Sequence, residues 1–213
     1  MTSLETAVLG LHIGAGVFAL LAGFGAMVAE KGGRRHVLSG RVFAVTLAVV
    51  LLTVPVLAAL DPTTFRLLLT LVAVFTGYFL FAGYRLATRK REANDATAVD
   101  WAALAALGLA CAGLVGGGGW LANNGDQFGL VLVVFGLIAL SSVSGEWRRF
   151  RGSDDADTWM TDHLSYMVAA NIATVTAVSA INLPVLPVAV RWLWPTVAGT
   201  ALIVYWQQSY GTD

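Results

Sequence analysis

The chain has 213 residues, of which 57% are hydrophobic and 12% are charged, and its basic and acidic side chains balance. An ordinary soluble domain carries about 25% charged residues, so this composition, with a mean hydropathy of +0.74, indicates a membrane protein rather than a soluble one. The zero net charge and the lack of a basic array with interleaved aromatic residues exclude nucleic acid as a partner. The expected partner is the lipid bilayer.

Seven apolar stretches are long enough to cross a bilayer core, which takes about 20 helical residues. The breaks between them carry turn-forming residues such as Asp61-Pro62 and Asn124-Gly125. The stretches cover residues 4–29, 37–60, 65–86, 101–121, 127–147, 159–183 and 185–207. Because the loops are too short to hold a soluble domain, we expect one all-α domain over residues 1–213, an integral membrane bundle of seven transmembrane helices.

Basic residues concentrate in alternate loops, and short cytoplasmic loops are rich in Lys and Arg. The pattern predicts an N-terminus outside and a C-terminus in the cytoplasm, with the protein in the cytoplasmic (cell) membrane. The basic residues of the first, third and fifth loops are Lys31, Arg34, Arg35, Arg85, Arg89, Lys90, Arg91, Arg148, Arg149 and Arg151. Tryptophans are expected at the interfaces, with Trp101, Trp147, Trp159 and Trp206 at inner ends and Trp120, Trp192 and Trp194 at outer ends.

Small residues recur at four-residue spacing, as in Gly10 with Gly14 and Gly113 with Gly117. Such spacing lets helix backbones approach closely in lipid. These Gly-rich faces predict either packing within the bundle or contact with a second copy or another membrane subunit. The run of four glycines at 116–119 favours close packing, with a hinge or broken turn at the outer end of the fourth helix as the alternative.

His12 lies about eight residues, or about 12 Å, inside the first span. An ionisable group at this depth indicates a functional site, and Gly10, Gly14 and Gly16 leave space around the ring. A neutral imidazole bonded to a neighbouring helix is the structural alternative.

His36 and His163 are expected at one depth near the inner ends of two helices. Two such histidines are able to ligate one haem iron or share a metal, since imidazole suits Fe, Zn and Cu. Arg41, more than a turn inside the second span, is a candidate partner for a haem propionate. The alternatives are headgroup contacts for His36 and a snorkelling side chain for Arg41.

The sixth span is the most polar, and it carries a row of polar side chains on one face at 100° per residue. We expect this row to face the interior, either bonding neighbouring helices or lining a path for protons or a small solute. Its members are His163, Asn171, Thr174 and Asn182.

Short motifs spread over most of the chain resemble a family of small bacterial and archaeal multi-pass membrane proteins known only as a domain of unknown function. The matching residues are Leu11-His12, Lys31-Gly32-Gly33, His36, Gly40-Arg41, Asp162-His163, Thr176, Asn182, Trp194-Pro195-Thr196 and Gly199. The resemblance implies a membrane bundle and gives weight to His12, His36, Arg41 and His163, but it implies no activity.

Three functions remain open from the sequence. The first is a b-type haem or quinone-linked redox protein that uses His36 and His163 with Arg41. The second is a small-solute or proton-coupled carrier or channel lined by His12 and the polar row. The third is an accessory structural subunit without chemistry.

Overall fold

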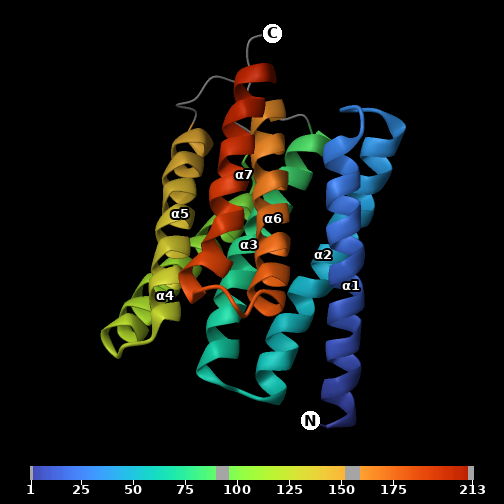
Figure 1. Cartoon of the computed structure of the whole chain (residues 1–213). Helices are drawn as coiled ribbons and strands as arrows, with labels where there is room; N and C mark the ends of the chain where they lie inside the picture. The colour runs from blue at the N-terminus through green and yellow to red at the C-terminus, as the bar shows by residue number, and fades with distance from the viewer. Residues whose placement is uncertain (1, 90–95, 152–158, 211–213) are drawn as a thin grey trace. The chain divides into compact units, whose positions relative to one another are not determined.

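The computed structural model describes residues 2–89, 96–151 and 159–210, which form seven α-helices (Figure 1). The helices are α1 (Ser3–Val28), α2 (Arg34–Leu60), α3 (Thr64–Arg89), α4 (Ala98–Asn123), α5 (Gln127–Phe150), α6 (Trp159–Asn182) and α7 (Val188–Tyr210). All seven are long and apolar enough to cross a membrane. The predicted all-α fold of seven spans is therefore confirmed, while the orientation of the termini stays a prediction.

The helix ends lie within a few residues of the predicted ones, and the largest shifts have simple causes. Helix α7 begins at Val188, three residues late, because a residue that precedes proline disfavours helical backbone and Leu186 precedes Pro187. Helix α2 begins at Arg34, just after its N-cap Gly33. Two of the basic residues predicted to lie in the third loop, Lys90 and Arg91, lie outside the described residues.

The chain divides into two compact units, Met1–Ala73 and Val74–Asp213, and the boundary falls inside α3. The single domain expected over residues 1–213 stays a prediction.

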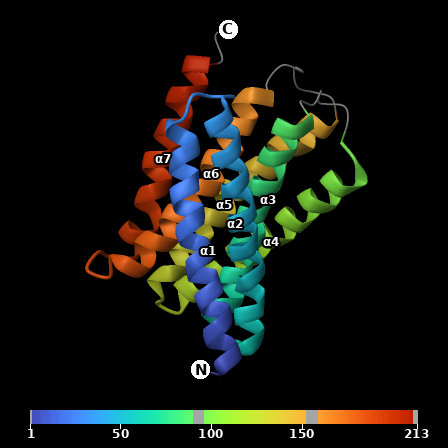
Figure 2. The ribbon, with the colours of Figure 1, turned by 90° about the vertical axis from the view of Figure 1, so that its right-hand side faces the viewer.

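In the first unit, α1 and α2 form an antiparallel hairpin and lie side by side in both views (Figure 1 and Figure 2). The turn between them contains Gly32 with a φ of +77°, a left-handed conformation that glycine adopts at little cost. Near the other end of the hairpin, Arg66 Nη2 lies 2.8 Å from Glu5 Oε1 and Arg66 Nη1 donates to Leu57 O. This ion pair joins α1 to the start of α3.

In the second unit, α4 and α5 pack closely because glycines face each other between them. A Cβ on Gly118 would lie 2.7 Å from Gly129 O and 2.9 Å from Leu132 Cβ. Helix α4 continues without a break to Asn123, so the run at 116–119 makes no hinge. Close packing is the observed role of Gly118, whereas a Cβ on Gly116 or Gly119 would meet nothing within 4 Å.

Helices α6 and α7 form a second hairpin that is tied together at a proline. Pro195 lies inside α7 and cannot donate to the carbonyl of Arg191, four residues earlier. Ser179 Oγ donates to that carbonyl at 2.7 Å, and Trp194 Nε1 donates to Ser179 Oγ at 2.7 Å. A side chain of α6 thus satisfies the backbone group that Pro195 leaves open, as helices in lipid require.

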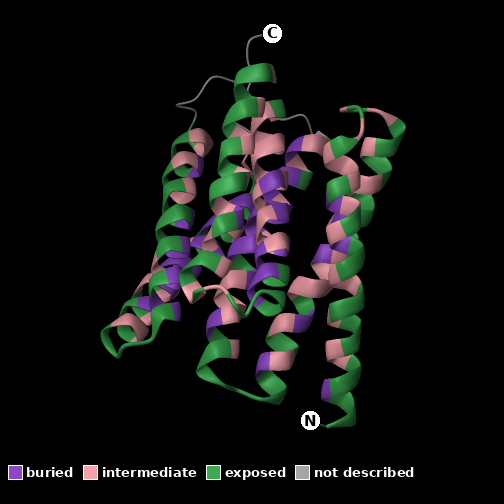
Figure 3. Cartoon of the chain, in the orientation of Figure 1, coloured by how far each residue is buried: buried purple, intermediate pink, exposed green. Residues whose placement is uncertain are grey.

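Many large apolar side chains are exposed, and in Figure 3 much of the ribbon of α1 has the colour of exposed residues. On α1 they include Leu11, Val17, Phe18 and Leu21. Such surfaces suit lipid contact in a membrane protein. Trp192 lies in the first two turns of α7 and is buried against Phe128 with ring centroids 4.8 Å apart; its expected place at the outer interface stays a prediction.

Candidate functional site

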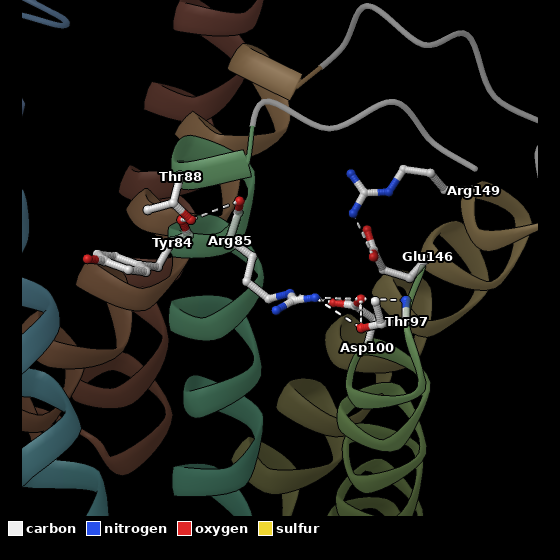
Figure 4. Close-up of polar contacts among 7 residues, drawn as sticks. All are labelled: Tyr84, Arg85, Thr88, Thr97, Asp100, Glu146 and Arg149. Carbon is white, nitrogen blue, oxygen red and sulfur yellow. Dashed lines mark hydrogen bonds and ion pairs between the residues drawn. The ribbon is translucent and has the colours of Figure 1, made fainter. Parts of the chain in front are cut away.

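The second unit holds a buried carboxylate, Glu146, which is 3% exposed near the end of α5. The hydroxyl of Tyr166, on α6, donates a hydrogen bond to Glu146 Oε1. Arg149 Nη2 lies 2.7 Å from Glu146 Oε2, one turn further along the same helix, and Figure 4 shows this pair. Both carboxylate oxygens therefore have a donor.

Arg149 also bonds a second acid, since its Nη1 lies 2.9 Å from Asp162 Oδ2. Asp162 is in the first turn of α6, where the helix dipole favours a negative charge. One guanidinium thus bridges two carboxylates, one of them buried (Glu146) and one partly exposed (Asp162). A buried carboxylate is costly unless it is paired and hydrogen-bonded.

Two tyrosines flank Glu146. Their rings meet edge to face, with the centroids of Tyr78 and Tyr166 6.3 Å apart at 87°, and Tyr166 also stacks on Phe79. The charges of Glu146 and Arg149 both act on the Tyr78 hydroxyl. We call Tyr78, Glu146, Arg149, Asp162 and Tyr166 the Glu146 cluster.

A second ion pair lies beside this cluster in Figure 4. Arg85 of α3 places Nε 2.6 Å from Asp100 Oδ1 and Nη2 2.8 Å from Asp100 Oδ2. Asp100 also accepts from the backbone N–H and the hydroxyl of Thr97 at the start of α4. This pair is balanced in charge and joins α3 to α4, so its arrangement fits a structural role.

His163 joins α6 to α3, because its Nδ1 lies 2.8 Å from Gly83 O. A carbonyl only accepts, so Nδ1 carries the proton and donates. Gly83 is a close-approach site, where a Cβ would lie 2.9 Å from Met167 Sδ and 3.1 Å from Tyr166 Cβ. The histidine thus helps to hold α3 against α6 beside the Glu146 cluster.

His36 has the same tautomer in the first unit, with Nδ1 donating to Ala26 O at 2.9 Å. Ala26 belongs to the last turn of α1, whose carbonyls lack partners within the helix. Lys31 Nζ donates to the neighbouring carbonyl of Met27, and burial lowers the pKa of the Lys31 ammonium. Both side chains therefore cap the end of α1.

His12 bonds a neighbouring helix within the first unit. Its Nδ1 lies 2.8 Å from Thr53 Oγ1, and the Thr53 hydroxyl donates its own proton to Val50 O at 2.6 Å. Because a hydroxyl has one proton, the imidazole must donate through Nδ1. This bond between α1 and α2 corresponds to the structural alternative given above for His12, an imidazole bonded to a neighbouring helix.

The polar row of α6 is buried over its middle but not at its outer end. Asn171 and Thr174 are buried, together with Thr176 and Ser179. Asn182 is exposed, and its side chain donates to Val178 O. At 100° per residue Thr176 lies on the opposite side of α6 from Asn171 and Thr174, so it is not a member of the expected row, and the role of that row stays a prediction.

The predicted cofactor residues are not assembled within either unit. His36 and Arg41 belong to the first unit and His163 to the second, so a shared haem or metal stays a prediction. Arg41 is exposed and makes no hydrogen bond or ion pair with residues in the described part of the chain. In that same part, no group of three His, Cys, Asp or Glu residues is placed to hold a metal ion.

Glu146 was not among the site residues predicted from sequence. It stands in Gly145-Glu146-Trp147-Arg148-Arg149, where it resembles one more charge at the cytoplasmic end of a span. A signal was present, however, because Glu146 and Arg149 are three residues apart and so share a helix face. Its partner Tyr166 is 20 residues away, and the sequence around Tyr166 does not indicate that the two side chains meet.

Comparison with known proteins leaves the family open. No family model matches the chain, and neither the curated proteins nor the solved structures contain a significant match. The resemblance drawn from its short motifs therefore stays a prediction.

Proposed function

We propose that this protein is a proton-coupled carrier or channel of the membrane and that Glu146 is the carboxyl group that binds the proton. The observation that carries the proposal is the Glu146 cluster, in which a buried carboxylate shares one arginine with a second acid. Ionisable groups inside membrane proteins mark proton relays and substrate paths by default.

The partners of Glu146 give the site its chemistry. The charged carboxylate is 3% exposed and depends on Arg149 and Tyr166 for its donors. When Glu146 takes up a proton, the neutral carboxyl still accepts from Tyr166, and Arg149 stays paired with Asp162. Proton binding at this position therefore leaves no buried group without a partner.

The buried polar residues of α6 support a polar route beside the cluster. Asn171 and Thr174 follow Tyr166 along the helix and are buried. Polar side chains buried inside a membrane protein are suited to solvating a moving proton or a small polar solute.

The test uses the purified protein in vesicles that enclose a pH-sensitive dye. After a potassium diffusion potential is imposed, we expect proton flux above that of empty vesicles, with most of it lost in Glu146→Gln. Arg41→Gln is the control, because Arg41 is exposed. Flux equal to that of empty vesicles, or full flux in Glu146→Gln, would rule out the proposal.

The alternative of a b-type haem protein is tested separately. If His36 and His163 ligate haem, the purified protein or the protein given haemin shows a Soret band that either histidine-to-alanine change abolishes. A colourless protein that takes up no haemin removes this alternative and leaves the carrier proposal unaffected.

A further inference from the structure

The turn between α1 and α2 carries two arginines that no acid in the described part of the chain neutralises. Arg34 and Arg35 are the first residues of α2, and both are exposed. Neither side chain forms a hydrogen bond or an ion pair with another described residue. Glu30, the nearest acid in the sequence, is exposed as well and pairs with neither arginine. This end of the hairpin therefore presents unpaired positive charge to its surroundings.

Two arginines near helix ends of the second unit differ from those of the turn. Arg85 pairs with Asp100 and Arg149 pairs with Glu146, so acids of the protein neutralise their charges. A guanidinium has N–H donors in a fork that matches two oxygens of a carboxylate or a phosphate. In the turn of the first unit, these donors meet no such partner among the described residues. The contrast indicates that they are available to an anion from outside the chain.

Exposed apolar side chains accompany the two arginines. Val28 ends α1 just before the turn and is 85% exposed. Leu38 follows Arg34 by one turn on the same face of α2 and is 62% exposed, and Val37 is exposed as well. We call Val28, Arg34, Arg35, Val37 and Leu38 the Arg34 surface. It combines positive charge with exposed apolar area at the ends of two helices that are long and apolar enough to cross a membrane.

We propose that the Arg34 surface binds an anionic phospholipid, with the phosphate at Arg34 and Arg35 and the first part of an acyl chain against Leu38. Basic residues at the end of a transmembrane helix attract anionic headgroups, and charge complementarity favours this occupant. A zwitterionic phospholipid has a cation of its own beside the phosphate, and a free phosphate ion has no chain for the apolar side chains to contact. No residue of the Glu146 cluster takes part, so lipid binding here does not depend on proton binding at Glu146.

Arg41 provides a matched control because of its depth. It is exposed on the same helix, but it follows Arg34 by seven residues, which is about 10 Å along a helix. Arg41 therefore lies deeper in the span than a phosphate bound at the turn, at the level of the acyl chains. Arg41→Gln removes the same charge from the same helix without removing a ligand of the phosphate.

The test measures lipid binding to the purified full-length protein in detergent by native mass spectrometry. Phosphatidylglycerol and phosphatidylcholine with identical acyl chains are supplied together, and we expect several-fold higher occupancy by phosphatidylglycerol in the wild type. Arg34→Gln and Arg35→Gln should each reduce this preference, whereas Arg41→Gln should keep it. Equal occupancy by the two lipids in the wild type, which needs no variant, would overturn the proposal. An equal loss of preference in all three variants would overturn it too, because net charge rather than the turn would then attract the lipid.

Two soluble competitors separate the lipid from its phosphate group. Glycerophosphoglycerol has the headgroup of phosphatidylglycerol without the acyl chains, and inorganic phosphate is the anion alone. Neither is expected to displace phosphatidylglycerol from the wild-type protein when added at the same concentration, because neither contacts the apolar side chains of the Arg34 surface. Displacement by either competitor would show that the turn binds a soluble phosphate and would overturn the lipid as its occupant.

Discussion

Arg149 bonds two acids at once, so its removal takes a donor from both Glu146 and Asp162. With Arg149→Leu, both Glu146 and Asp162 lose a donor in a poorly solvated site. Breaking a buried ion pair from one side costs about 3–5 kcal/mol, which we expect as a lower unfolding temperature in detergent.

The matched control is Arg41→Leu, because Arg41 is exposed and surface changes usually stay within about 0.5 kcal/mol. Arg149→Lys keeps the charge but loses the forked geometry that serves two carboxylates, so an intermediate loss is expected. Equal stability of Arg149→Leu and Arg41→Leu would contradict the ion pairs described for the site.

The hydrogen bond between His12 and Thr53 gives a second prediction at this scale. Thr53→Val keeps the shape of the side chain and leaves His12 Nδ1 without an acceptor. Interhelical hydrogen bonds in membranes are worth about 0.6 kcal/mol on average and up to about 1.7, so we expect a small drop in the unfolding temperature. Thr46→Val should show less, since the Thr46 hydroxyl bonds only carbonyls of its own helix; an equal drop in both would argue against the bond.

The contact between α4 and α5 depends on the lack of a side chain at one glycine. In Gly118→Ala the new Cβ would meet the backbone of α5 at Gly129 O and Val133 N, which cannot move aside as a flexible side chain does. Forced overpacking costs about 1–3 kcal/mol.

Gly119→Ala is the control for this clash, because a Cβ there meets nothing within 4 Å and alanine favours helix by about 1 kcal/mol over glycine. The two neighbouring substitutions should therefore move the unfolding temperature in opposite directions. A rise in the unfolding temperature of both variants would show that the glycines act through helix propensity alone.

The helices were predictable from sequence because the bilayer sets the length of each apolar stretch, and Gly33, Pro187 and Asn124-Gly125 mark their ends. The contacts between side chains that build the Glu146 cluster were not predictable from sequence. Ser179 and Glu146 matter because of the atoms they meet, an open carbonyl in α7 and a tyrosine of α6. Pairings of this kind depend on how helices rotate against each other, which composition and spacing do not specify.

At the scale of the whole molecule, the distribution of basic residues predicts which loops face the cytoplasm. Residues 30 and 124 are separated by the three helices α2, α3 and α4, and an odd number of crossings places them on opposite sides of the membrane. The first loop carries Lys31, Arg34 and Arg35, which are retained on the cytoplasmic side, so position 124 is expected outside.

The topology test starts from Cys111→Ala, which removes the only cysteine, a buried one, and so leaves no background thiol. Glu30→Cys or Asn124→Cys is then added, since both positions are exposed. A membrane-impermeant maleimide should label position 124 in intact cells and position 30 only after the membrane is opened. Labelling of both in intact cells would refute the seven-crossing topology, and labelling of position 30 alone would reverse it. The reversed result would place the Glu146 cluster, near the end of α5 that precedes the basic fifth loop, at the outer side of the membrane.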